Sequence, residues 1–427
     1  MATPSKPKHG VVPPPPNHSG VAPPPSVAPV IPPPPKRPTV TPAPKLHPDR
    51  LATFDIEIYW NYLLITIVEI KPDGTAGGII EIEQIDNTSY LNGAVVNRAI
   101  CKVKLFEILS EYTMVSFNGI KFDNLVLTGY MNDLQTYDLK SLCNMIINER
   151  LMPWTFERRF GYKLLDYDHI DLIEVAFGTG SLKLYGARLE SKRLQELPIH
   201  ENSLIGPSAR AQLRQYCIND NTVTRELYNE CKPAIRLREY LGEKYNTDFR
   251  SKSDAQIGEA ILAIEAERKT GVQLRKPNVK TMPRLFKYTA PDFVQFTTPV
   301  MQSLKDLCTS TEFKISTSTN KVTLPKEISK VVTLGDGDLE VGYKMGIGGL
   351  HSVTKTSYYE CKDDEEIFEI DASSFYPNII LNGRFHIPSI GESDFHDIYS
   401  RILDEKNRAS ARLSDVEKRL AELKAML

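Results

Sequence analysis

The segment from Leu51 to Ile85 constrains the fold most, because it contains successive β-strand patterns separated only by short turns. In LATFDIEIY, apolar side chains occupy every second position, which is the period of a strand that buries one face: Ala52, Phe54, Ile56 and Ile58. A continuous apolar run, YLLITIVEI, follows at 62–70, and the turn KPDGT leads into a third strand, GIIEIEQI. The folded part of the chain is therefore expected to begin with a three-stranded meander.

Helical and strand patterns alternate after the meander. We expect a helix over 95–112, a short strand in TMVSFN at 113–118 and a helix in DNLVLTGYM at 123–131. Helices dominate 208–270, where Ser253 and Gln256 form the expected capping box of a helix in SDAQIGEAILAIEAER. Three strands, a helix, a strand and a helix resemble the element order of the ribonuclease-H-like α/β fold, so we expect a domain of that kind.

The composition is that of a globular protein without a membrane segment. The chain has 427 residues, enough for two or three domains, with 41% hydrophobic and 25% charged residues. It has no apolar run that would cross a bilayer and no secretory signal, so we expect a cytoplasmic protein. Its six cysteines are scattered without a CxxC pair, which argues against a zinc site or a disulfide framework. Because the net charge is −2, binding to DNA would depend on local basic patches or metal ions.

Residues 1–50 differ from the rest of the chain. They contain VVPPPPNHSGVAPPP and VIPPPP, and they carry basic residues but no acidic residue before Asp49. Such a segment has few groups to bury and few backbone donors for helix or sheet, so we expect a disordered tail, partly polyproline II. It suits a basic tether, and alternatively a ligand for a Pro-recognising partner domain.

Two polar motifs belong to the expected strands, one on the first strand and one directly after a later strand. Asp55 and Glu57 lie two residues apart on the first strand, so their carboxylates share one face and together suit a hard divalent cation. Asn118 and Asp123 lie where the strand in TMVSFN passes into the next helix, a common position for site residues. Each motif alone has a simpler alternative: a solvated strand face for the first, and an aspartate that caps a helix for the second.

A third motif lies on a helix. Tyr216 and Asp220 are four residues apart, which places a phenol and a carboxylate on the same helix face. The alternative is a core aromatic beside a surface acid. Lys183 in SLKLYGARL is a further candidate, although a single lysine is more often a surface charge. Asp171 in HIDLIEVAF is another acid, and no motif reaches it securely.

Taken together, DxE, NxxxFD and YxxxD in this order resemble the three exonuclease motifs of family-B DNA polymerases, within the DnaQ-like class. The resemblance implies that two Mg²⁺ or Mn²⁺ ions are held by four acids: Asp55, Glu57, Asp123 and Asp220. It also implies that Tyr216 orients the attacking water and that Lys183 contacts the phosphate. Asn118 and Phe122 would hold the single-stranded 3′ end of DNA.

The segment DASSFYPN resembles palm motif A of the same family. By this resemblance, Asp371 binds the catalytic metal ions at the end of a strand, EIFEID at 366–371. The incoming dNTP would be bound by the residues that follow: Ser373, Ser374, Phe375 and Tyr376. The sequence departs from the family pattern at two positions: it has Phe375 where the family has Leu, and Asn378 where the family has Ser. Neither departure affects the metal ligand.

The resemblance divides the chain into five parts: a tail (1–50), a 3′→5′ exonuclease domain (51–235), a helical and mixed connection (236–340), a partial α+β palm (341–393) and the start of a fingers helix (394–427). The last helix carries an apolar seam, which we expect to meet a second fingers arm: Leu413, Val416, Leu420, Leu423 and Leu427. No second palm acid of the DTD type and no KxxxNSxYG motif occurs in the sequence.

These observations predict the N-terminal portion of a family-B DNA polymerase that binds primer–template DNA. The amino-acid sequences of several segments are similar to those of bacteriophage polymerases. This similarity would place the protein in the host cytoplasm. The rest of the polymerase could reside on a second chain, or the sequence could be truncated. Two alternatives are a stand-alone 3′→5′ exonuclease and a non-catalytic DNA-binding subunit of a split polymerase.

Overall fold

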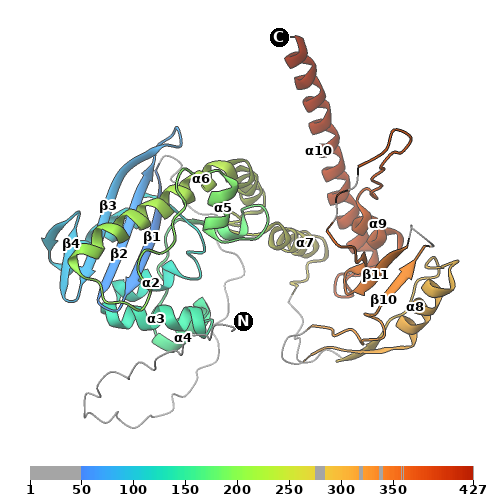
Figure 1. Cartoon of the computed structure of the whole chain (residues 1–427), viewed down its shortest axis with the longest axis horizontal. Coiled ribbons are helices and arrows are strands. Elements are labelled where there is room, and N and C mark those ends of the chain that lie inside the picture. Colours follow the sequence, from blue (N-terminus) through green and yellow to red (C-terminus); the bar gives the residue numbers. More distant parts are fainter. Residues whose placement is uncertain are drawn as a thin grey trace, which may run out of the picture.

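The computed structural model describes residues 50–274, 284–316, 321–335, 340–356, 358 and 360–426. The predicted Pro-rich tail lies outside the described residues, except for Arg50 at its end. Figure 1 shows a blue and green body built on one large sheet, and an orange and red body built from small sheets and helices. Helix α7 (Asp254–Thr270) lies between the two bodies.

One mixed sheet of seven strands organises the first body, in the order β5-β4-β3-β2-β1-β6-β7. The strands from β1 to β5 form an antiparallel meander, whereas β6 runs parallel to β1 and β7 runs parallel to β6. The strand bounds are β1 Leu51–Tyr59, β2 Tyr62–Ile70, β3 Ala76–Ile85, β4 Thr88–Leu91, β5 Ala94–Val96, β6 Thr113–Ser116 and β7 His169–Asp171. The predicted α/β class is confirmed, and so are the three predicted strands of the meander.

Helices cover both faces of this sheet (Figure 1). One face packs against α1 (Arg98–Glu111), α2 (Asp123–Met131) and α3 (Thr136–Asn148), through a core that includes Phe54, Ile56 and Ile58. The other face packs against the long helix α6 (Pro207–Tyr245), which crosses β1 and β2. Two layers of helix explain why β2 is apolar at almost every position, since side chains on both of its faces are buried.

Shorter elements complete the first body. Helix α4 (Pro153–Phe160) packs beside α3, and α5 (Leu182–Arg188) lies against α6. A single 3-10 turn, η1 (Leu172–Glu174), follows β7. Helix α6 continues past residue 235, the predicted end of the exonuclease domain, to Tyr245.

The second body contains two small antiparallel sheets, β8-β9 and β10-β11-β12. Ala266 of α7 packs against Phe395 and Ile398 of the terminal helix, and the predicted capping box of Ser253 is present at the start of α7. The bounds are β8 Leu285–Lys287, α8 Pro299–Ser310, β9 Glu312–Lys314, β10 Val331–Leu334, β11 Val341–Gly346, β12 Gly349–Ser352, α9 Phe375–Asn382 and α10 Glu392–Met426.

The prediction of a strand over 366–371 is wrong. These residues belong to no described strand, and the side chains of Phe368 and Ile370 are 76% and 95% exposed. A strand needs a neighbour that accepts and donates backbone hydrogen bonds, and no described strand pairs with this segment. The apolar pattern by itself therefore does not form a strand here, because no described strand lies beside it to pair with.

The predicted helix of the last part is confirmed as α10, which extends away from the other elements in Figure 1. The described members of its apolar seam, Leu413, Val416, Leu420 and Leu423, are all at least half exposed. Leu427 lies outside the described residues. Every described helix is too short or too polar to span a bilayer.

Candidate metal centre

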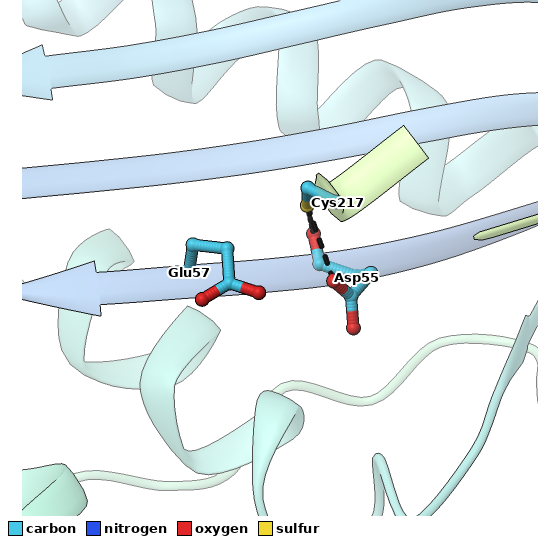
Figure 2. Close-up of side chains that lie close together, drawn as sticks. All are labelled: Asp55, Glu57 and Cys217. Atoms are coloured by element: carbon cyan, nitrogen blue, oxygen red, sulfur yellow. Dashed lines mark hydrogen bonds between the residues drawn. The ribbon is translucent and has the colours of Figure 1, made fainter. Parts of the chain in front are cut away.

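Two carboxylates project from the middle of β1 toward α6. Asp55 and Glu57 share the strand face opposite the apolar core, as the period of two predicts. Figure 2 shows them side by side on β1, with Cys217 of α6 directly against Asp55. A ligand atom from each of these three residues lies within 4.8 Å of the other two. This is the densest group of potential metal ligands among the described residues.

Two further acids reach the same site from helices. Asp123 is the first residue of α2, directly after the turn that follows β6, and it is 6% exposed. It does not cap the helix, because the N-cap position belongs to Phe122. Asp220 lies one turn after Tyr216 on α6, and the Tyr216 hydroxyl acts to lower the pKa of its carboxyl group. Repulsion between the charges indicates that Asp123 and Asp220 lie near the pair on β1, whereas among the described residues only Asp55, Glu57 and Cys217 have ligand atoms within 4.8 Å of one another.

The pKa values of these acids are raised by burial and by repulsion between their charges. Burial, followed by repulsion from Asp220, raises the pKa of Asp55 to about 7. Burial and then repulsion from Asp55, Asp220 and Asp123 raise the pKa of Glu57 well above its ordinary value. Burial and Asp55 act on Asp123 in the same direction. Clustered carboxylates with raised pKa values are typical of sites that bind a cation or move protons.

Asp220 is influenced by neighbours of both signs. Burial raises its pKa to about 6, and the Tyr216 hydrogen bond and the Lys183 ammonium partly oppose this rise. Lys183 lies on α5, and its Nζ is 5.9 Å from the centroid of the Tyr216 ring. Its ion pair with Glu196, at 2.7 Å, involves a glutamate that is 92% exposed and therefore holds it only weakly. Lys183 is thus a cation near Tyr216 and Asp220, and its predicted contact with a phosphate stays a prediction.

The turn between β6 and α2 has an unusual conformation. Asn118 has a φ of +67°, in the left-handed region. Its neighbour Gly119 has no room for a side chain, because a Cβ there would come within 2.1 Å of the Ser116 Oγ. Asn118 is half-buried, and Phe122 packs partly against the core below the sheet. Asn118 thus lies in the turn that leads to Asp123, and Phe122 directly precedes this acid in the chain.

Asp171 holds this turn in place. Its carboxylate accepts hydrogen bonds from the backbone N–H groups of Asn118 at 2.7 Å, Ile120 at 3.0 Å and Ile173 at 3.1 Å. It is 2% exposed and contributes to the raised pKa of Asp123. The sequence motifs assign Asp171 no role. A signal was available, however, because an acid between Ile170 and Leu172 in the largely apolar run HIDLIEVAF needs buried donors to compensate its charge.

The predicted nucleotide-binding residues lie in the second body, apart from the four acids. Asp371 is exposed, and Ser373 and Ser374 form a turn before α9. Phe375 and Tyr376 open that helix, with side chains that are 53% and 67% exposed and ring centroids 5.6 Å apart. A turn at 373–374 and helix α9 follow Asp371.

Comparisons of the chain with protein-family models, with curated proteins and with solved structures gave no match in any of the three. The donor atoms of the site therefore indicate which ion it could hold. Four carboxylates supply only oxygen donors, and one lysine lies beside them, which suits a hard divalent cation such as Mg²⁺ or Mn²⁺. The thiol of Cys217 is the one soft donor in this set.

Proposed function

We propose that the first body is a metal-dependent 3′→5′ exonuclease that acts on single-stranded 3′ ends of DNA, and that the chain is the N-terminal portion of a family-B-type DNA polymerase. The observation that carries the proposal is the meeting of Asp55, Glu57, Asp123 and Asp220. These acids come from three motifs far apart in the sequence. Asp55 and Glu57 lie side by side on β1, Asp123 is buried, Asp220 is partly exposed, and their negative charges repel one another.

The sheet topology supports the ribonuclease-H-like, DnaQ-like assignment. Three antiparallel strands followed by two parallel ones, with β1 between β2 and β6, is the arrangement that this assignment requires. It puts the middle of β1 beside the start of α2, so acids on both elements face the same space. The proposed fold and the proposed site are thus consistent with each other.

The residues suit hydrolysis of a phosphodiester. Bound divalent ions, held by the four acids, would supply the positive charge that attack on an already anionic phosphate needs. The Tyr216 hydroxyl, fixed by Asp220, can orient the attacking water. Lys183 can bind a phosphate oxygen. The new bond joins the water oxygen to phosphorus, the bond to the 3′ oxygen breaks, and a deoxynucleoside 5′-monophosphate leaves.

Proofreading also requires that the protein binds the 3′-terminal nucleotides of the primer. Asn118 lies in the β6–α2 turn and Phe122 directly precedes Asp123, so a 3′-terminal nucleotide that binds there would present its phosphate to the acids. Phe122 can stack on or wedge against a base. We propose that this turn binds the last nucleotides of a frayed primer.

For the second body we propose a role in nucleotide transfer only together with a further segment or chain. Asp371 is one palm acid, and the sequence contains no second one of the DTD type. An exonuclease that works without the polymerase site is the second candidate. It is favoured by one observation: the four exonuclease acids are assembled within the first body, whereas Asp371 is exposed.

The test uses the full chain, a 5′-labelled primer–template with a 3′ mismatch, Mg²⁺ and all four dNTPs. We expect the primer to shorten from its 3′ end without extension. Asp123→Ala should lower the shortening rate by roughly 100-fold or more. Equal rates for Asp123→Ala and the parent would refute the proposed site, and extension by this chain alone would refute the proposed lack of a complete polymerase site.

A further inference from the structure

A buried chain of polar groups lies behind Asp55. Thr66 on β2 is the direct cross-strand neighbour of Asp55 in the antiparallel register. Cys217 and Asn221 lie one turn apart on α6, which packs over this part of the sheet. Thr66 and Cys217 are fully buried, and Asn221 is 1% exposed. Polar groups this deep must find partners inside the protein.

Asn221 is the first donor in this series of hydrogen bonds. Its Nδ2 lies 2.7 Å from the Thr66 Oγ1, 3.1 Å from the Cys217 carbonyl oxygen and 3.4 Å from the Thr66 carbonyl oxygen. A backbone carbonyl can only accept, so the atom that faces two of them must be the amide nitrogen and not the amide oxygen. The Thr66 hydroxyl therefore accepts from Asn221.

The remaining hydrogens follow from this assignment. The Thr66 hydroxyl still has its own hydrogen to donate, and the Cys217 Sγ lies 2.9 Å away. The thiol of Cys217 then accepts from Thr66 and donates onward to Asp55, whose carboxylate Oδ2 is 3.1 Å and whose backbone carbonyl oxygen is 3.4 Å from the sulfur (Figure 2). The carboxylate oxygen is the nearer and the charged acceptor, so the thiol hydrogen is assigned to it. Each donor then has an acceptor, in the order Asn221, Thr66, Cys217, Asp55.

We propose that Cys217 is a positioning residue of the metal centre, and that it holds the Asp55 carboxylate in the orientation needed for a divalent ion through a thiol hydrogen bond that Thr66 and Asn221 direct. The inference rests on the proposed function, because it assumes that Asp55 is a metal ligand. Cys217 acts on the reaction only through Asp55. Partners that orient ligands in this way commonly change metal affinity or activity by about 10- to 100-fold when they are removed.

The proximity of the thiol to Asp55 and Glu57 permits a second role, direct ligation by sulfur. The two roles differ in what Thr66 does. If Cys217 positions Asp55, loss of the Thr66 hydroxyl releases the thiol from its orientation and should weaken Mg²⁺ binding. If the sulfur is a ligand, loss of Thr66 should matter little, and thiophilic ions such as Cd²⁺ should bind better than Mg²⁺.

Four variants of the full chain separate these cases: Cys217→Ala, Cys217→Ser, Thr66→Val and Thr66→Ser. We measure the Mg²⁺ concentration for half-maximal cleavage of a 3′ overhang, and the affinity for Mn²⁺ from the electron paramagnetic resonance signal of the free ion. Cys217→Ala and Thr66→Val should each weaken Mn²⁺ binding and raise the Mg²⁺ requirement by about 10-fold. The serine variants, which keep a donor, should stay within about 3-fold of the parent.

Thr66→Val removes the hydroxyl with little change in side-chain shape and leaves the Asn221 Nδ2 its two carbonyl acceptors, so it tests the hydrogen bond even if Cys217→Ala unfolds. Parent-like Mn²⁺ affinity in Thr66→Val overturns the inference, and so does a Cd²⁺ preference that only the Cys217 variants abolish. Mn²⁺ binding needs no catalysis. A parent that binds Mn²⁺ but leaves DNA intact refutes the proposed function while the variants still decide the role of Cys217. A parent that binds no Mn²⁺ overturns both.

Discussion

Asp55→Asn should stabilise the metal-free protein at pH 8 by about 2 to 4 kcal/mol. Burial and repulsion from Asp220 raise the pKa of Asp55 to about 7, about three pH units above the ordinary value of 3.8. Each pH unit corresponds to about 1.4 kcal/mol, so a charged Asp55 costs the native state at most about 4 kcal/mol. Asp55 keeps partial access to solvent, which lowers the expected gain toward 2 kcal/mol.

The sign of the pH dependence follows from proton binding. Below about pH 4, Asp55 is protonated in both the folded and the unfolded chain. Between about pH 4 and pH 7 only the folded chain retains the proton, so the stability of the parent falls as the pH rises through this window. Asp220, whose pKa is raised to about 6, acts in the same direction. His169 acts in the opposite direction below about pH 6.5, because burial lowers its pKa to about 3.

Urea unfolding in EDTA at pH 5, 6, 7 and 8 measures this effect. Trp60 and Trp154 are the two tryptophans of the chain and both lie in the first body, so their fluorescence reports on its unfolding. Because His169 is unchanged by the mutation, the quantity to compare is the free energy of unfolding of Asp55→Asn minus that of the parent. This difference should grow from pH 5 to pH 8.

The exposed Asp415 on α10 provides the matched control, since Asp415→Asn removes a charge that is not part of the cluster. Adding Mg²⁺ at pH 8 should stabilise the parent more than Asp55→Asn, because a cation neutralises the cluster only where the ligands are intact. A difference that is flat with pH, or an Asp55→Asn protein less stable than the parent at pH 8, would refute the assignment of a strained carboxylate cluster.

Three further outcomes are expected. Lys183→Ala should lower the exonuclease rate by about 10- to 100-fold in a single-turnover assay, because it removes the cation beside Glu57 and Asp220, whereas Lys183→Arg should retain most of the rate. Asp171→Asn should destabilise the protein in urea by about 1–3 kcal/mol, because an amide cannot accept all three backbone hydrogen bonds, and unchanged stability would contradict that role. Asp371→Ala should leave exonuclease rate and melting temperature unchanged, since the side chain is exposed in the other body, and a lost exonuclease would contradict the separation of the two sites.

Local patterns in the sequence were sufficient for the longer strands β1, β2 and β3, for β6, and for the helices α1, α2 and α6 of the first body. Alternation predicted β1, and the run DNLVLTGYM coincides with α2, because side-chain periodicity and helix boundaries depend on neighbours within a few residues. Spacing alone also put Asp55 and Glu57 on one face of a strand. The short strands β4, β5 and β7 escaped prediction, because three or four residues carry too little periodic signal to distinguish a strand from a loop.

Tertiary packing decided the rest. The strand expected at 366–371 did not form, since its apolar pattern cannot supply the neighbouring strand that its backbone needs. Asp123 and Asp220 come near Asp55 only because the chain folds so that α2 begins beside β1 and α6 packs against it. The roles of Asp171 and Cys217 depend on hydrogen bonds across 53 and 162 residues of chain, respectively. Contacts over such separations are set by how layers pack, and a sequence read residue by residue does not contain that geometry.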